Sequence, residues 1–189
     1  MGIILLAALL FLAIGAVLYF VSVYNGLIMV SRNIDKAWAN IDVLLKQRHD
    51  EIPKLIQVCE GYMKYERQTL EKITAARTAC IQAKSVGESA QKEGQLSGLL
   101  KNLFAVAENY PDLKANQNFL QLQQRISYLE SQIADRREFY NDSVTTYNIR
   151  INQIPDMWVA RNLKMAAREL FKIAEEERKD TEIKFNLPT

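Results

Sequence analysis

The chain opens on a continuous apolar run. Residues 3–23 carry no charged side chain, and the first charged side chain of the sequence is that of Arg32. About 20 apolar residues are enough for a helix to cross the hydrocarbon core of a bilayer. We therefore expect a transmembrane anchor helix over residues 1–24. Its apolar side chains include those of Ile3, Leu6, Leu10, Phe11, Ile14, Leu18 and Val23.

A cleaved signal peptide is the alternative interpretation of this run. A signal peptide begins with a basic region, whereas only Met1 and Gly2 precede the apolar residues here. The sequence Ala13-Ile14-Gly15 is a poor cleavage site, and cleavage there would leave an apolar start on the mature chain. An uncleaved anchor is the better interpretation.

The distribution of charge predicts the orientation of the anchor. Arg32, Lys36, Lys46 and Arg48 follow the apolar run, and no basic side chain precedes it. Because an excess of Lys and Arg marks the cytoplasmic side of a membrane helix, we expect the C-terminal domain to lie in the cytoplasm.

Beyond the anchor, apolar residues recur every three or four positions, which is the period of an amphipathic helix. The first stripe comprises Ile34, Trp38, Ile41, Leu45, Ile52, Leu55, Cys59, Tyr62, Leu70, Ile73, Ala76 and Cys80. It predicts one long helix, which Pro53 should kink or divide because proline lacks a backbone N–H donor. Cys59 and Cys80 would lie about 30 Å apart on that helix, too far for a disulfide.

Three shorter helices should follow, over residues 96–106, 119–151 and 157–173. Helical segments joined by short turns favour antiparallel neighbours. We therefore predict an all-α fold, in which an N-terminal transmembrane helix is followed by an antiparallel four-helix bundle with long helices. The bundle should occupy residues 25–180 and leave a short tail at residues 181–189.

Turn and capping residues mark the expected helix ends. Ser85 begins a break with capping chemistry, and Asn116 or Asn118 is a candidate N-cap of the helix over residues 119–151. That helix should end before Pro155, because the residue before proline resists the helical conformation. Asp156 could cap the last helix.

Composition and charge exclude several classes of protein. The chain has only 7 Gly and 4 Pro, too few for the turns of an all-β fold. Its 24 basic and 22 acidic residues give a net charge of +2, which argues against a nucleic-acid-binding surface. A single His and 2 Cys leave little material for a metal site or a thiol nucleophile.

The candidate chemical residues favour structural roles. His49 lacks the partner ligands that a di-metal, zinc or haem site would need, so we interpret it as a surface or partly buried helical residue. Cys59 and Cys80 should be inert residues of the core. We therefore expect no catalytic residue, no metal, no cofactor and no small-molecule substrate.

Arg136 is the exception on the apolar stripes, because it alone is polar in the stripe over residues 119–151. One interpretation is that its stem covers apolar surface while its guanidinium reaches water. The alternative is an ion pair, inside the bundle or across a partner interface, with Glu66 or Asp50 as the acid.

Several motifs between Tyr24 and Ile154 resemble the LemA family. They include the segment after the apolar run, the block around Trp38 and the long segment from Glu108 to Ala115. The residues that carry the resemblance are Tyr24, Asn25, Trp38, Asp42, Pro53, Asn109, Tyr110, Pro111, Asp112, Lys114, Tyr140 and Asn141. After Ile154 the chain departs from the pattern usual in the family.

The resemblance implies a single-pass protein of the bacterial inner membrane with a helical-bundle domain and no established catalytic site. It also implies association with a zinc membrane protease of the HtpX type, and a magnetosome-associated branch of the family implies roles in membrane organisation.

Two hypotheses from different classes follow. The first is a non-enzymatic scaffold or adaptor that contacts itself, as a homo-oligomer, or a membrane-protein partner. The alternative is an enzyme or a metal- or cofactor-binding bundle whose site the sequence does not reveal. A protein that handles lipid or organises membranes is a third option.

Overall fold

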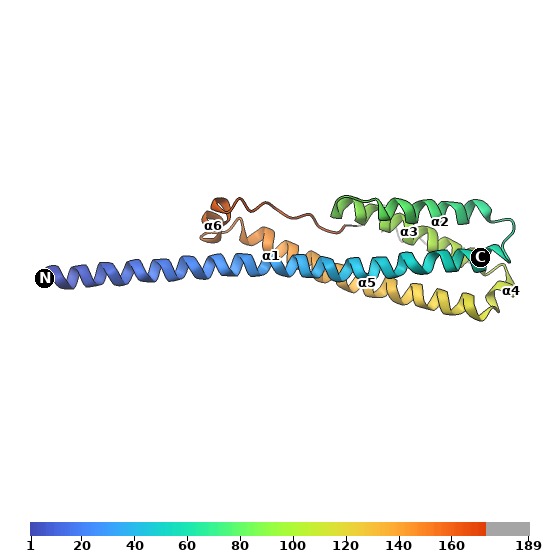
Figure 1. Ribbon diagram of the computed structural model, residues 1–189, viewed down its shortest axis with the longest axis horizontal. Helices are drawn as coiled ribbons and strands as arrows, with labels where there is room; N and C mark the ends of the chain where they lie inside the picture. The colour runs from blue at the N-terminus through green and yellow to red at the C-terminus, as the bar shows by residue number, and fades with distance from the viewer. Residues whose placement is uncertain (173–189) are drawn as a thin grey trace, which may run out of the picture. The chain divides into compact units, whose positions relative to one another are not determined.

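The computed structural model describes residues 1–172 and shows an all-helical chain over them. The helices, shown in Figure 1, are α1 (Gly2–Glu60), α2 (Arg67–Ile81), α3 (Val86–Ala107), α4 (Pro111–Lys114), α5 (Gln117–Arg150) and α6 (Asp156–Asn162). The predicted all-α class with a long apolar N-terminal helix is confirmed, whereas the antiparallel four-helix bundle stays a prediction. The expected tail at residues 181–189 lies outside the described residues.

The chain divides into two compact units. Among the described residues, the first unit consists of residues 1–42 and 135–170, and the second consists of residues 43–134 and 171–172. Helices α1 and α5 each contribute one part to each unit. We describe each unit by itself.

The first part of α1 is uncovered by any other described residue. Large apolar side chains from Ile3 to Val21 are exposed, and the most apolar window of this helix is 0% buried. By length and composition, α1 is the one helix among residues 1–172 that could cross a membrane. Val23, which we expected in the anchor, is instead buried by protein, and so is Leu27. Packing of the first unit therefore begins where the apolar run ends.

Proline does not divide α1. Pro53 lies inside the continuous helix, so of the two expected effects a division near Ile52 is wrong, and a kink stays a prediction. Proline cannot donate to the carbonyl of the residue four positions earlier, which here is His49. Nε of Arg77, on α2, donates a 2.7 Å hydrogen bond to that carbonyl. A side chain from a neighbouring helix thus satisfies the acceptor that Pro53 leaves without a backbone donor.

The predicted single helix through Cys59 and Cys80 is also wrong. Helix α1 ends at Glu60, a turn follows at residues 61–66, and α2 begins at Arg67. Cys59 therefore lies on α1 and Cys80 on α2, and both are buried free cysteines, as expected of core residues. Tyr62, expected in the core, is 40% exposed. The period of the apolar residues alone did not reveal this turn.

The second unit has one apolar core. Helices α2 and α3 pack against each other, and α3 also contacts α4. Buried residues from five helices and from the turn after α1 form one cluster, which consists of Ile52, Leu55, Cys59, Met63, Leu70, Ile73, Cys80, Leu96, Leu100, Leu103, Ala107, Leu113, Phe119 and Ile126. This cluster is the principal source of stability for the unit, because burial of apolar surface drives folding.

The predicted capping residues are confirmed for two helices. The side chain of Ser85 accepts a hydrogen bond from the backbone N–H of Glu88 at the start of α3. The side chain of Asn116 accepts from the backbone N–H of Phe119, at 3.1 Å, at the start of α5. Helix α5 ends at Arg150, before Pro155, as expected.

The predicted last helix is mostly wrong. Helix α6 ends at Asn162, and the described residues that follow are not helical. Lys164 has a left-handed φ of 52°, and the N–H groups of Lys164 and Met165 donate to the carbonyls of Arg161 and Ala160. This hydrogen-bond pattern terminates a helix. The part of the predicted helix at Ile173 lies outside the described residues.

Side chains of α5 hold the non-helical segment in the first unit. The hydroxyls of Tyr140 and Tyr147 donate to the carbonyls of Glu169 and Ala166, at 2.9 and 3.1 Å. Asn148 exchanges two hydrogen bonds with the backbone of Arg168, both at 2.9 Å. The backbone groups that a helix would have paired internally are paired here with side chains.

The pairing of Pro53 with Arg77 can be tested by a double-mutant cycle in the full chain. We expect Arg77→Met to lower the free energy of unfolding by about 1–3 kcal/mol, because it removes the donor to the His49 carbonyl. In a Pro53→Ala background the loss should be clearly smaller, because the alanine supplies a backbone N–H to the same carbonyl. Urea unfolding in mild detergent, followed by circular dichroism, gives both values. Equal losses in the two backgrounds would contradict the pairing.

Candidate functional site

A buried arginine lies on the apolar stripe of α1 in the second unit. Leu45 and Ile52 are seven residues apart, and Arg48 occupies the stripe position between them. Its side chain is only 2% exposed, although arginine is almost never fully buried without partners. The helix therefore brings a full positive charge into the unit, and acidic groups must be found close to it.

Two carboxylates and a hydroxyl surround the Arg48 guanidinium. Nη2 forms a short ion pair with Glu93 on α3, and Nη1 lies 2.6 Å from Oε1 of Glu130 on α5. Nη1 also donates to the hydroxyl of Ser97, at 2.8 Å, and this hydroxyl donates to Glu130 at 2.9 Å. Arg48 thus connects three helices of the unit through charge-assisted hydrogen bonds.

His49 and Cys80 complete this buried polar cluster. Nε2 of His49 lies 2.9 Å from Oε1 of Glu93, and both side chains are buried. One potential ligand atom each from His49, Cys80 and Glu93 lies within 4.8 Å of the other two. The interpretation of His49 as a surface or partly buried residue is therefore corrected, because the imidazole is buried next to a carboxylate.

Burial and charge shift the pKa values within the cluster. Burial alone would raise the pKa of the Glu93 carboxyl, but the His49 contact and the charge of Arg48 outweigh it and hold this pKa below its ordinary value. Burial first, and then the charge of Glu93, raise the pKa of the Cys80 thiol to about 12. Glu93 is therefore ionised at neutral pH, and Cys80 is a thiol rather than a thiolate nucleophile.

The cluster is an ion-pair network centred on the Arg48 guanidinium. Glu93 and Glu130 both pair with the guanidinium of Arg48, and Glu93 also contacts the His49 imidazole. A metal ion would have to displace the proton of Cys80 and share Glu93 with Arg48. The geometry therefore fits an internal electrostatic bridge better than a reactive centre.

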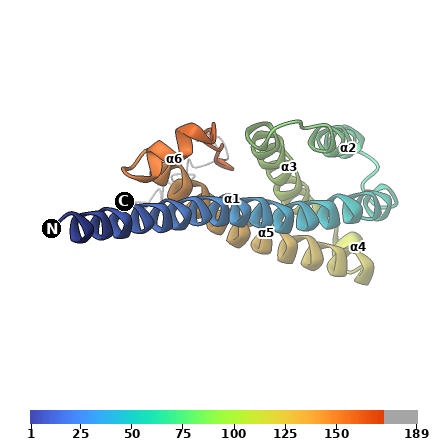
Figure 2. The same ribbon diagram turned by 60° about the vertical axis from the view of Figure 1, so that its left-hand side comes forward.

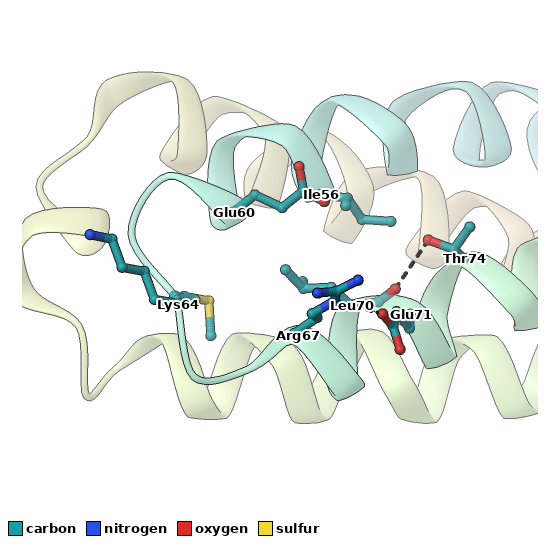
Figure 3. A pocket seen from close by; sticks show the side chains of 8 residues that line it. Ile56, Glu60, Lys64, Arg67, Leu70, Glu71 and Thr74 are labelled. Atoms are coloured by element: carbon teal, nitrogen blue, oxygen red, sulfur yellow. Dashed lines mark hydrogen bonds and ion pairs between the residues drawn. The ribbon is translucent and has the colours of Figure 1, made fainter.

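Two open clefts also mark the surface of the second unit. The first, of about 360 Å³, lies between the end of α1 and the start of α2. Figure 3 shows Glu60, Lys64, Arg67 and Glu71 around the apolar side chains of Ile56 and Leu70. The Thr74 hydroxyl at its edge donates to the Leu70 carbonyl of its own helix, at 3.1 Å. Mixed charge around an apolar floor suits a contact with another protein chain.

The second cleft is a groove of about 510 Å³ between α1 and α5. Lys54 and Gln57 line it from α1, and Asn118, Gln121 and Arg125 line it from α5. These polar groups can donate and accept hydrogen bonds from a partner surface.

Comparison with protein families identifies the chain. The LemA family matches residues 37–185. The chain belongs to the LemA family. It is also 30% identical over 172 residues to Protein LemA of Metamycoplasma hominis, an alignment that covers 88% of this chain and 77% of that protein.

More distant relatives of this LemA-family chain are magnetosome proteins. It is 23% identical over 163 residues to Magnetosome protein MamQ 2 of Paramagnetospirillum magneticum, covering 72% of this chain. It is 20% identical over 158 residues to Magnetosome protein MamQ of Magnetospirillum gryphiswaldense, covering 70% of this chain. The alignments span 60% and 58% of these two relatives. None of these names describes an enzyme.

The LemA-family motif residues are distributed over both units. Trp38 and Tyr140 meet in the first unit, with ring centroids 5.7 Å apart. In the second unit, Pro111 begins α4, and Lys114 forms an ion pair with Glu108. The other motif residues are exposed or half-buried, namely Tyr24, Asn25, Asp42, Pro53, Asn109, Tyr110, Asp112 and Asn141. The structural roles expected of these motif residues stay a prediction.

The structure distinguishes the two interpretations of Arg136. Its side chain is exposed, so an ion pair buried inside the described chain is wrong. A role at a partner interface stays a prediction. The buried arginine of this LemA-family chain is Arg48 instead, and the signal for it was the seven-residue gap in the first apolar stripe.

The structural role of Arg48 predicts a large loss of stability on its removal. We expect Arg48→Met to lower the free energy of unfolding of the full chain by about 3–5 kcal/mol, because Glu93 would stay buried without its guanidinium partner. Arg67→Met is the matched control, because Arg67 pairs with Glu71 at 2.9 Å on the surface. The control should change stability by about 0.5 kcal/mol or less. Similar losses for the two variants would contradict the role.

The lowered pKa of Glu93 gives this experiment a second arm. A carboxyl group whose pKa is lower in the folded state than in the unfolded state stabilises the fold. This stabilisation is complete at pH values above the pKa of the unfolded state, and it is lost as the pH falls through the pKa of the folded state. The difference in unfolding free energy between the wild type and Glu93→Gln should therefore shrink as the pH falls below the ordinary glutamate range. A difference in unfolding free energy that stays constant with pH would show that the negative charge of Glu93 does not contribute to stability.

Proposed function

We propose that this chain is a single-pass, non-enzymatic scaffold or adaptor of the bacterial inner membrane, with the residues after the anchor in the cytoplasm. It acts through helical contacts with a second copy of itself or with a membrane-protein partner. The observation that carries this proposal is the uncovered apolar part of α1, which is continuous with the folded part of the first unit.

The arrangement of chemical groups within residues 1–172 supports a function without catalysis. In the buried cluster around Arg48, the guanidinium holds both carboxylates in ion pairs. Burial also raises the pKa of Cys59 to about 12, so neither cysteine is a thiolate at neutral pH. The two clefts present charged and amide side chains that can form hydrogen bonds at the polar rim of a protein interface.

An HtpX-type zinc membrane protease is the membrane-protein partner that the family resemblance favours. A membrane anchor confines both proteins to one bilayer, which raises their effective concentration. The alternative partner is a second copy of this chain. The exposed cleft at the end of α1 is the surface that we propose for the contact.

Site-specific photo-crosslinking in membranes tests the scaffold proposal. A photoreactive residue at Lys64, in the cleft, should give an adduct with the mass of a dimer of this chain or of a complex with the HtpX-type protease. The same residue at Ser131, exposed on α5 and outside both clefts, is the matched control and should give less adduct. The absence of both adducts at Lys64, together with a strict monomer by light scattering, would contradict the proposal.

The close approach of His49, Cys80 and Glu93 supports metal binding as the second candidate function. A soft thiolate with an imidazole and a carboxylate suits Zn²⁺. Binding would release the Cys80 proton to solvent, so affinity should rise with pH. We rank this candidate lower, because Arg48 already occupies Glu93.

Titration of the purified full chain with Co²⁺ decides between the candidates. The scaffold proposal predicts no thiolate-to-cobalt absorption band. A stoichiometric band that is lost in Cys80→Ser but retained in Cys59→Ser would establish the metal site. Cys59 is the matched control because it is also buried and free, and it lies outside the cluster.

A further inference from the structure

Three large apolar side chains are exposed where α5 ends and α6 begins. Ile149, Ile154 and Trp158 are 50%, 67% and 63% exposed. They lie within ten residues of one another, on two helices of the first unit and the turn between them. Single exposed apolar residues need no explanation, but three of them within ten residues, one a tryptophan, make this segment a candidate contact surface.

Arg150 fixes the position of this group along α1. Its Nε lies 2.7 Å from Oδ2 of Asp156, at the start of α6, and its Nη1 donates to the carbonyl of Gly26, at 3.4 Å. A Cβ atom at Gly26 would lie 3.0 Å from Nη2 of Arg150, so glycine permits this close approach. Asp156, which we expected to cap α6, is therefore an ion-pair partner that holds α6 next to α1.

The site of attachment lies just past the apolar run. Gly26 is three residues beyond Val23, or about 4.5 Å along the helix axis. The headgroup layer on each side of the hydrocarbon core is about 5–7 Å thick. Figures 1 and 2 both show α6 beside α1 where the uncovered blue part of that helix ends. If α1 spans the bilayer, α6 lies at the depth of the headgroups.

The residue types of this segment fit the membrane interface. Tryptophan and tyrosine are enriched at that depth, and basic side chains nearby favour anionic headgroups. Trp158 is followed by Arg161 and Lys164, which are both exposed. Tyr24, on α1 and two residues before Gly26, is also partly exposed, at 39%.

We propose that the segment from Ile149 to Trp158 is a second membrane contact, which lies on the bilayer surface beside the end of the transmembrane helix. Ile154 and Trp158 enter the interfacial layer, and Arg150 holds them at that depth through Asp156 and Gly26. The bilayer is the occupant of this segment because Arg150 attaches the segment to α1 just past the uncovered apolar part of that helix. The inference rests on the proposed membrane anchor.

Depth-dependent fluorescence quenching of the full chain tests this inference. The sequence has 2 Trp, so Trp38→Phe leaves Trp158 as the only indole. In vesicles of phosphatidylcholine and phosphatidylglycerol, Trp158 should emit at shorter wavelength than a tryptophan in water. Lipids with a spin label near the headgroup should quench it more than lipids labelled deep in the chain, and aqueous iodide should quench it weakly.

The matched control is Trp158→Phe, which leaves the half-buried Trp38 as the only indole. We expect lipid spin labels to quench Trp38 several-fold less than Trp158. Circular dichroism checks that both variants are folded. If Trp38→Phe does not fold, the wild-type signal minus that of Trp158→Phe reports on Trp158.

The outcomes separate this inference from the proposed anchor. Protein that floats with the vesicles while Trp158 is quenched by iodide and not by lipid labels would overturn the second contact alone. Shielding of Trp158 from both quenchers would also overturn it, because protein rather than lipid would then cover the indole. Protein that does not float with the vesicles would overturn the anchor, and the second contact with it.

Discussion

The structure depends on one constraint, which is that the first part of α1 exposes apolar side chains that no other described residue covers. Its 13 Leu, Ile, Val and Phe residues between Ile3 and Val21 favour insertion into a bilayer by about 4–8 kcal/mol in total. Water is therefore a poor environment for this part of the helix. The LemA family match covers residues 37–185, which follow this run.

The second unit illustrates how polar groups can be placed in a helical core. Two buried polar groups on α1 have partners on other helices: the Arg48 guanidinium pairs with α3 and α5, and the His49 carbonyl accepts from α2. Such pairs add less to stability than apolar packing does, but removal of either partner leaves a group that is costly to bury. The pairs can therefore specify which helices meet and in which register.

Local sequence signals predicted the features that depend on one segment. The apolar run, the regular period of α5 and the caps at Ser85 and Asn116 were all predictable, because each depends on neighbours within a few residues. The features that were missed depend on contacts between segments. Arg48 is tolerated on an apolar stripe because Glu93 and Glu130 meet it, and Pro53 is tolerated in a helix because Arg77 supplies a donor. The non-helical segment after α6 likewise depends on hydrogen bonds from α5.

The most direct test of the account is where the intact chain partitions. Membranes from expressing cells can be extracted with alkaline carbonate, which strips peripheral proteins, and the mass of the chain in each fraction can be measured. The account predicts that the chain stays in the membrane pellet with residues 1–24 still attached. A chain recovered in the soluble fraction with that segment removed would contradict it.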